Sequence, residues 1–203
     1  MINKHHIAAS IASLLLAASV SHAGSTVIGS VQSDTRVNSA AQRQSGLLNK
    51  QEANVGSVSD SRIIGSVRSR TTVNSLRQNQ SGLLNKQEAN IGSVKGSTVI
   101  GSVRTDTRVN SLRQNQSGLL NKQEANIGAV KDSRVIGSVR SRTRVNRLSQ
   151  NQSGLLNKQV ANIGSVVDST VIGAVNTRVS VNSLSQSQSG LLNKQKLSIG
   201  SVD

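Results

Sequence analysis

The chain contains no cysteine, proline, phenylalanine, tyrosine or tryptophan, and its only methionine is Met1. Its three histidines all lie within the first 22 residues. An exported chain without cysteine has no disulfide to stabilise it. Beyond residue 23 the usual general base, the thiol nucleophile and the common soft-metal ligands are absent, and so is any Ser-His-Asp arrangement. We therefore expect no enzyme activity, no catalytic residue, no metal site and no cofactor.

The absence of aromatic side chains argues against an ordinary globular core, because aromatics contribute much of the buried area in such cores. The apolar residues are valine, isoleucine, leucine and alanine, spaced with glycine, serine, asparagine and glutamine. A chain of this composition could be disordered. However, its β-branched residues recur at fixed positions, which a disordered linker would not require.

Five tandem units of 36 residues follow the first 23 residues. Their boundaries are 24–59, 60–95, 96–131, 132–167 and 168–203. A repeat of this length indicates a stacked array in which each unit buries its apolar face against its neighbours. The first and last units carry no additional capping segment, so the array is expected to expose strand edges that template the addition of another copy.

Residues 1–23 have the pattern of a secretory signal peptide. Lys4 supplies a positive charge, residues 7–20 form a short apolar stretch, and Ser21-His22-Ala23 is a small-x-small cleavage site. The apolar stretch is shorter than the roughly 20 residues that a membrane-spanning helix needs. Cleavage would coincide with the start of the first unit, so we expect a secreted protein in an extracellular fibre or at the cell surface.

Each unit contains four short runs rich in β-branched residues and bounded by turn-forming residues. In the third unit these runs are 98–103, 107–112, 117–123 and 126–130. Glycine recurs too often for a helix. The pattern predicts an all-β protein, specifically a cross-β solenoid of five 36-residue repeats.

The number of rungs per repeat is left open by the spacing, and charge favours two. One position holds lysine in every unit, for example Lys86 and Lys122. With one rung per unit these ammonium groups would stack about 4.8 Å apart and repel by roughly 0.9 kcal/mol per neighbouring pair. With two rungs the distance doubles and salt screens most of the repulsion. Glu88 and Glu124, two residues after their lysines, would moderate it in either case.

Three positions hold the same residue in every unit and are expected to form ladders along the stack. The isoleucines are expected to point inward beside a valine ladder, and the amides are expected to hydrogen-bond along the axis, unless they only solvate a surface. The sets are Ile28, Ile64, Ile100, Ile136 and Ile172; Gln44, Gln80, Gln116, Gln152 and Gln188; and Asn49, Asn85, Asn121, Asn157 and Asn193.

The segment Gln80-Ser81-Gly82-Leu83-Leu84-Asn85 reads Q-x-G-x-x-N and recurs in all five units. This motif resembles the core of the curlin repeat found in curli subunits. Residues 37–41 followed by 46–51 are also similar to the Fap-type amyloid repeats of pseudomonads. Both resemblances imply an exported bacterial functional amyloid that polymerises with itself and depends on a nucleator and an outer-membrane export machinery.

The function expected from these features is a self-assembling structural subunit of an extracellular amyloid fibre, serving biofilm matrix and adhesion. The alternative is a non-amyloid β-solenoid adhesin or surface-binding repeat protein. The five units hold 23 lysines and arginines against nine acidic residues, a net charge of +14. Such a basic surface should attract polyanions such as extracellular DNA or acidic polysaccharide without sequence specificity. No small-molecule substrate is expected.

Overall fold

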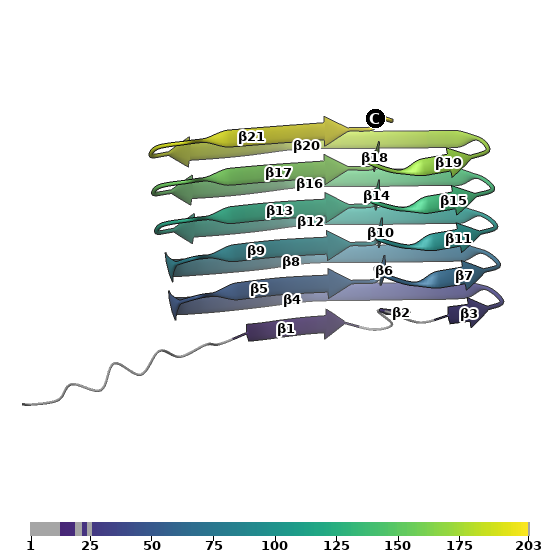
Figure 1. The fold of residues 1–203 in the computed structure, drawn as a ribbon, viewed down its shortest axis with the longest axis horizontal. Coiled ribbons are helices and arrows are strands. Elements are labelled where there is room, and N and C mark those ends of the chain that lie inside the picture. Colours follow the sequence, from purple (N-terminus) through teal and green to yellow (C-terminus); the bar gives the residue numbers. More distant parts are fainter. Residues whose placement is uncertain (1–12, 19–21, 24–25, 203) are drawn as a thin grey trace, which may run out of the picture.

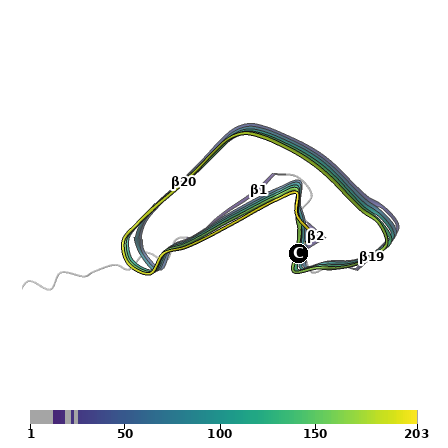
Figure 2. The same ribbon diagram turned by 90° about the horizontal axis from the view of Figure 1, so that it is seen from above.

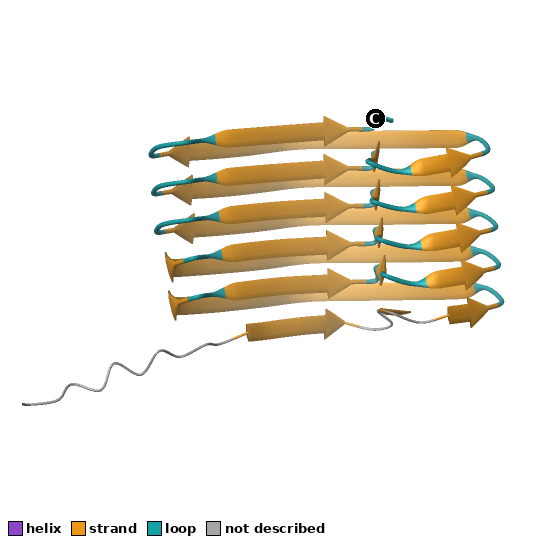
Figure 3. Ribbon diagram, in the orientation of Figure 1, coloured by secondary structure: helices purple, strands orange, loops and turns teal. Residues whose placement is uncertain are grey.

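The computed structural model describes residues 13–18, 22–23 and 26–202, and these residues form strands and turns with no helix. Most of the apolar leader stretch and Ser21 of the expected cleavage site lie outside the described residues. The strands stack as successive coils of a parallel β-solenoid (Figures 1 and 3). The predicted all-β solenoid of 36-residue repeats is therefore confirmed.

Each coil consists of one long strand, one shorter return strand and two very short strands. The long strands are β4 (Val31–Leu47), β8 (Val67–Leu83), β12 (Val103–Ser117), β16 (Val139–Ser153) and β20 (Val175–Ser189). The return strands are β5 (Lys50–Val55), β9 (Lys86–Ile91), β13 (Lys122–Ile127), β17 (Lys158–Ile163) and β21 (Lys194–Ile199). The short strands are β6 (Val58–Ser59), β10 (Val94–Lys95), β14 (Val130–Lys131) and β18 (Val166–Val167), then β7 (Arg62–Ile64), β11 (Thr98–Ile100), β15 (Arg134–Ile136) and β19 (Thr170–Ile172).

One repeat makes one coil, so the expectation of two rungs per repeat is wrong. From the first unit onward, every strand pairs in parallel with the strand 36 residues later, as in Val103 with Val139 and Lys122 with Lys158. The long strand is the reason, because β12 runs without interruption through residues 107–112, which were predicted as a separate run, and reaches residue 117, where the next predicted run begins. The chain reverses tightly only once per repeat. At about 4.8 Å per coil the five coils rise roughly 24 Å, half the height that ten rungs would give.

The cross-section of a coil is elongated, with a tight turn at one end and a group of short strands at the other (Figure 2). Two apolar clusters fill it. One packs Val109 and Leu112 of the long strand against Ala125 and Ile127 of the return strand, with equivalent residues above and below. The other fills the angle between the short strands and the start of the long strand, where Val99, Val130 and Val103 meet.

Three strands of the N-terminal segment lie beneath the first full coil. They are β1 (Ser13–Ala18), β2 (His22–Ala23) and β3 (Thr26–Ile28), which pair with β5, β6 and β7. The long-strand sheet ends at β4, so among the described residues nothing pairs with the lower edge of that strand. The described leader strands β1 and β2 therefore cover part of the lower end of the stack, and the longest edge, that of β4, has no partner strand among the described residues. No helix in the described part of the chain has the length and apolarity needed to cross a membrane.

Candidate assembly and binding surfaces

The predicted glutamine ladder lies inside the coil near the tight turn. Its three central members are buried, and the amide nitrogen of each donates to the side-chain oxygen of the glutamine one coil below. The nitrogen-to-oxygen distances are 3.2 Å from Gln116 to Gln80 and 2.9 Å from Gln152 to Gln116. Gln188 continues the ladder into the fifth coil at 3.0 Å.

The predicted asparagine ladder closes the tight turn. Asn85 Nδ2 donates to the backbone oxygen of Gly82 in its own turn, at 2.6 Å, and to Ser117 O in the next coil, at 2.8 Å. It also lies 3.2 Å from Asn121 Oδ1. Leu84, between these partners, adopts a left-handed φ of 58°, which is uncommon for a bulky residue. The buried asparagine thus offsets a strained turn through bonds to two successive coils.

The isoleucine row stacks in register but faces outward, contrary to expectation. Ile100 pairs with Ile64 and Ile136, and these three side chains are 37–40% exposed. The residue before each, such as Val99, is buried instead. The valine three positions later is buried, because Val103 lies four positions after Val99 and the alternation is kept through Gly101, whose φ is 140°. A Cβ on Gly101 would lie 1.8 Å from Gly65 O, which only glycine avoids.

Two further inward amide ladders were not singled out from the sequence. One runs through Gln78, Gln114 and Gln150, and the other through Gln87, Gln123 and Gln159. All six side chains are fully buried. The sequence did indicate the first of these ladders, because Gln78 lies two residues before the buried Gln80 and therefore on the same face of the strand. The narrow part of the coil is consequently filled with hydrogen-bonded amides rather than apolar groups.

In the second and third units a buried ion pair lies at the re-entrant corner between the return strand and the short strand after it. Glu88 contacts Lys95, lies 3.2 Å from Lys86 and accepts a hydrogen bond from Asn90. Burial opposes ionisation of Glu88, but the hydrogen bonds from Lys95 and Asn90 and the nearby lysine charges prevail and lower its pKa to about 2. Burial likewise opposes the charge of Lys95, yet its bond to Glu88 raises the pKa of this lysine.

The same pair recurs one coil higher as Glu124 and Lys131, and the pKa of Glu124 is also lowered despite its burial. In the fourth unit both positions change together, to Val160 and Val167, and both valines are buried. The joint replacement shows that the corner accepts either a paired charge or two apolar groups. In the first three units, ion pairs with Glu52, Glu88 and Glu124 also moderate the repulsion between the recurring lysines that stack one coil apart.

An exposed apolar surface runs along the tight turns. It is lined by ten leucines, here called the leucine surface: Leu47, Leu48, Leu83, Leu84, Leu119, Leu120, Leu155, Leu156, Leu191 and Leu192. Each is at least 38% exposed, and the row crosses all five coils. Contiguous exposed apolar surface of this kind is typical of an interaction site.

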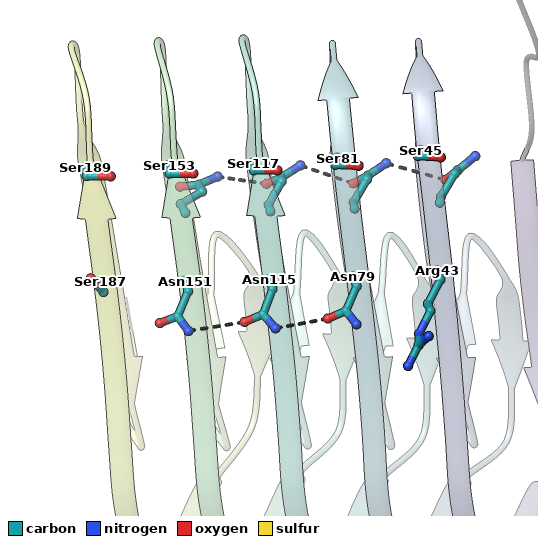
Figure 4. Close-up of a pocket in the computed structure, with 14 residues that line it drawn as sticks. Arg43, Ser45, Asn79, Ser81, Asn115, Ser117, Asn151, Ser153, Ser187 and Ser189 are labelled. Carbon is teal, nitrogen blue, oxygen red and sulfur yellow. Dashed lines mark hydrogen bonds between the residues drawn. The ribbon is translucent and has the colours of Figure 1, made fainter.

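The outer side of the long strands near the tight turn is polar. It carries a serine row from Ser45 to Ser189 beside an asparagine row of Asn79, Asn115 and Asn151 (Figure 4). The asparagines donate to one another from coil to coil at 3.0–3.2 Å. In the part of the chain that the structure describes, no group of three or more histidine, cysteine, aspartate or glutamate side chains is placed to hold a metal ion.

Comparisons of the chain with models of known protein families, with curated protein sequences and with solved structures found no match in any of the three.

Proposed function

We propose that this protein is an exported, non-enzymatic structural subunit that stacks end to end into an extracellular cross-β fibre. The observation that carries the proposal is the state of the amide ladders at the two ends of the stack. At the lower end, Gln44 Nε2 and Asn49 Oδ1 are buried and have no hydrogen-bond partner in the described chain. A buried polar atom without a partner costs about 1–3 kcal/mol.

The upper end offers the complementary atoms. Within the stack each ladder glutamine donates downward, as Gln188 does to Gln152, so the Oε1 of Gln188 is the acceptor that a next coil would use. Within the stack each ladder asparagine donates upward, as Asn157 does to Asn193, so Asn193 Nδ2 is the donor that a next coil would use. A second copy placed on top in the same register would therefore satisfy both orphaned atoms.

The backbone supports the same head-to-tail arrangement. The strands β19, β20 and β21 of the fifth unit are the outermost strands of their sheets among the described residues, whereas β18 of the fourth unit is bridged by Val202. Alternate side chains of β20 are half-buried where the equivalent residues of β12 and β16 are fully buried. An unpaired strand edge with a half-covered core face is a template for another strand. The leucine surface would then extend along a fibre without interruption and could join neighbouring fibres.

Export and localisation rest on the signal-peptide pattern of residues 1–23, and the resemblance of Q-x-G-x-x-N to curlin repeats supports the functional-amyloid class. The expected result is that purified protein forms thioflavin-positive fibres with reflections near 4.7 Å and 10 Å. Protein that keeps a β-type circular dichroism spectrum and stays monomeric for days at high concentration would contradict the proposal.

A pair of proline variants tests the growth edge itself. The amide of Val139 donates to Ala174 O in the next coil, and Val175 is its equivalent in the fifth coil. Val175→Pro removes a donor that is needed only by an added copy, and proline at the first residue of an edge strand is tolerated. We expect Val175→Pro to fold but to elongate fibres at least tenfold more slowly. Val139→Pro removes an internal bond and should reduce folding itself.

A surface-binding solenoid that remains monomeric is the second candidate. The observation that favours it is the large exposed cationic area on the long strands, which does not depend on assembly. Monomeric protein that binds cell surfaces or their polymers would support this candidate and would leave the fold unchanged.

A further inference from the structure

The outer side of the first half of the long strands is strongly basic. Three alternating positions on β4, β8, β12, β16 and β20 point outward there, and we call them the arginine face. Nine exposed arginines and two aspartates occupy these positions, a net charge of +7 out of +15 for the chain. The arginines are Arg36, Arg68, Arg70, Arg104, Arg108, Arg140, Arg142, Arg144 and Arg178, and the aspartates are Asp34 and Asp106.

The charges of this face are poorly compensated within the molecule. Arg104 is in register with Arg68 below and Arg140 above, and Arg108 is in register with Arg144. Like charges one coil apart repel by roughly 0.9 kcal/mol per pair in water. The ion pair that the structure gives on this face joins Arg70 to Asp34 at 3.7 Å, with both side chains more than half exposed. An exposed ion pair of that kind contributes little to stability.

The lysines at the re-entrant corner, in contrast, have acidic partners. Lys86, Lys95 and Lys131 each contact a buried glutamate. The chain therefore has a way to neutralise stacked cations, but on the arginine face acidic residues occupy only the middle of the three rows, where Asp34 and Asp106 alternate with Arg70 and Arg142. The unneutralised rows are available to an external anion.

The geometry of the face fits a stiff polymer of phosphates. Neighbouring outward positions of the backbone are spaced about 4.8 Å along the stack and about 6.6 Å along each strand, so that the arginines arise from an area of roughly 20 by 13 Å. Buried Val103, Thr105 and Thr107 alternate with the outward residues and fix the strand beneath them. The forked guanidinium binds phosphate oxygens in pairs, which favours arginine over lysine for this purpose.

We propose that the arginine face binds duplex DNA through its phosphate backbone, without reading sequence. A duplex carries about 12 charges over 20 Å, more than enough to match the net charge of the face. It is stiff on this length scale, so it loses little freedom on a rigid flat surface. The chain has no aromatic residue on which unpaired bases could stack, which favours a duplex over a single strand. This inference goes beyond the proposed structural role, because the face is complete within one copy.

The test is fluorescence anisotropy of the full-length chain with a labelled 30-base-pair duplex between 50 and 200 mM salt. The variant Arg104→Gln/Arg140→Gln/Arg144→Gln removes three charges from the face. Its matched control, Arg134→Gln/Lys158→Gln/Lys194→Gln, removes three exposed charges from other strands. We expect the face variant to lower affinity at least tenfold at 100 mM salt and to reduce the slope of log K against log salt by about 2 to 3. The control should change affinity less than threefold, and two unrelated duplex sequences should bind equally.

Equal losses in the two triple variants would overturn the proposal, because they would show attraction by net charge alone. Polygalacturonate that competes as well as unlabelled duplex at equal charge concentration would assign the face to acidic polysaccharide instead, and would equally overturn it. Circular dichroism checks that each variant keeps its β spectrum. Should the triple variant unfold, Arg108→Gln and Arg144→Gln replace it singly, with an expected slope change of about 1 each.

Discussion

At the scale of single residues, the narrow half of each coil is held by amides rather than by apolar packing. Gln114 is fully buried, donates to Gln78 Oε1 at 2.8 Å and to Glu124 O at 3.2 Å, and accepts from Gln150 at 2.8 Å. Stacked amides of this kind use the coil spacing directly, because each one bonds to the identical residue above and below. They allow polar residues to fill the interior. The loss of one amide, however, leaves its buried neighbours without a hydrogen-bond partner.

We therefore expect Gln114→Met to lower the free energy of unfolding by about 2–4 kcal/mol, since it leaves buried partners on Gln78 and Glu124 unsatisfied. The matched control is Asn110→Leu, which removes two ladder bonds of 3.0 Å from an exposed row. Water replaces those bonds, so the control should change stability by less than about 1 kcal/mol. Urea unfolding followed by circular dichroism measures both, and equal effects would contradict the role assigned to burial.

The buried glutamate at the corner gives a second residue-scale prediction, on pH. The folded pKa of Glu88 is about 2, below its ordinary value of 4.5. Its contribution to stability is therefore fully present above pH 4.5 and is lost as the pH falls from 4.5 toward 2. This lowering of the Glu88 pKa corresponds to about 3 kcal/mol of folding stability. Glu124 should add to that stability in the same direction, because its pKa is also lowered.

We expect the wild-type unfolding midpoint in urea to fall across this acid range. Glu88→Gln should weaken the dependence, whereas Asp34→Asn at an exposed position should leave it unchanged. An identical acid dependence in Glu88→Gln and wild type would assign the effect to other carboxylates.

At the scale of the element, corners decide which side chains enter the core. Simple alternation along 98–103 puts Ile100 and Val103 on opposite faces, so the expected inward pair of isoleucine and valine ladders would need a break in the alternation. The structure has no such break, with Val99 and Val103 inside and Ile100 outside. The valine ladder was therefore placed correctly and the isoleucine ladder was not.

This arrangement makes Gly101 more sensitive to substitution than its neighbour Ile100. Gly101→Ala places a Cβ 1.8 Å from Gly65 O at a φ of 140°, so we expect a loss of several kcal/mol or failure to fold. Ile100→Asp exposes a carboxylate at a site already 38% exposed and should cost less than about 1.5 kcal/mol. Thermal unfolding of the two variants decides the matter, and a larger effect for Ile100→Asp would place that side chain inside.

At the scale of the whole molecule, the leader and the proposed assembly are linked. β1 and β2 pair with the lower edges of β5 and β6, so removal of residues 1–23 would uncover both edges. We expect residues 24–203 to polymerise with a lag several times shorter than that of the full-length chain, measured by thioflavin fluorescence. A chain lacking only 13–18 should have an intermediate lag because β2 remains. Equal lag times in all three proteins would show that the leader does not block the addition of another copy at the lower end of the stack.

The sequence by itself determined the repeat, the β class and the in-register ladders, because residues that recur every 36 positions must stack when each unit packs only on its neighbours. It also indicated which amides stack, through Gln44, Asn49 and their equivalents. It did not determine the number of coils, since the lysine argument treated Glu88 and Glu124 as moderating the repulsion equally for one or two rungs and did not anticipate their burial beside Lys86 and Lys122.

Only the tertiary structure decided which side of each strand faces inward beyond a turn, because the alternation changes phase at the tight turn, between buried Gln80 and buried Asn85, but not at Gly101. It alone brought Glu88 to Lys95 across a corner, exposed the leucines at a turn closed by Asn85, and collected arginines from five strands on one face. These features depend on where the chain bends within the coil, and a local periodicity does not specify the direction of a bend.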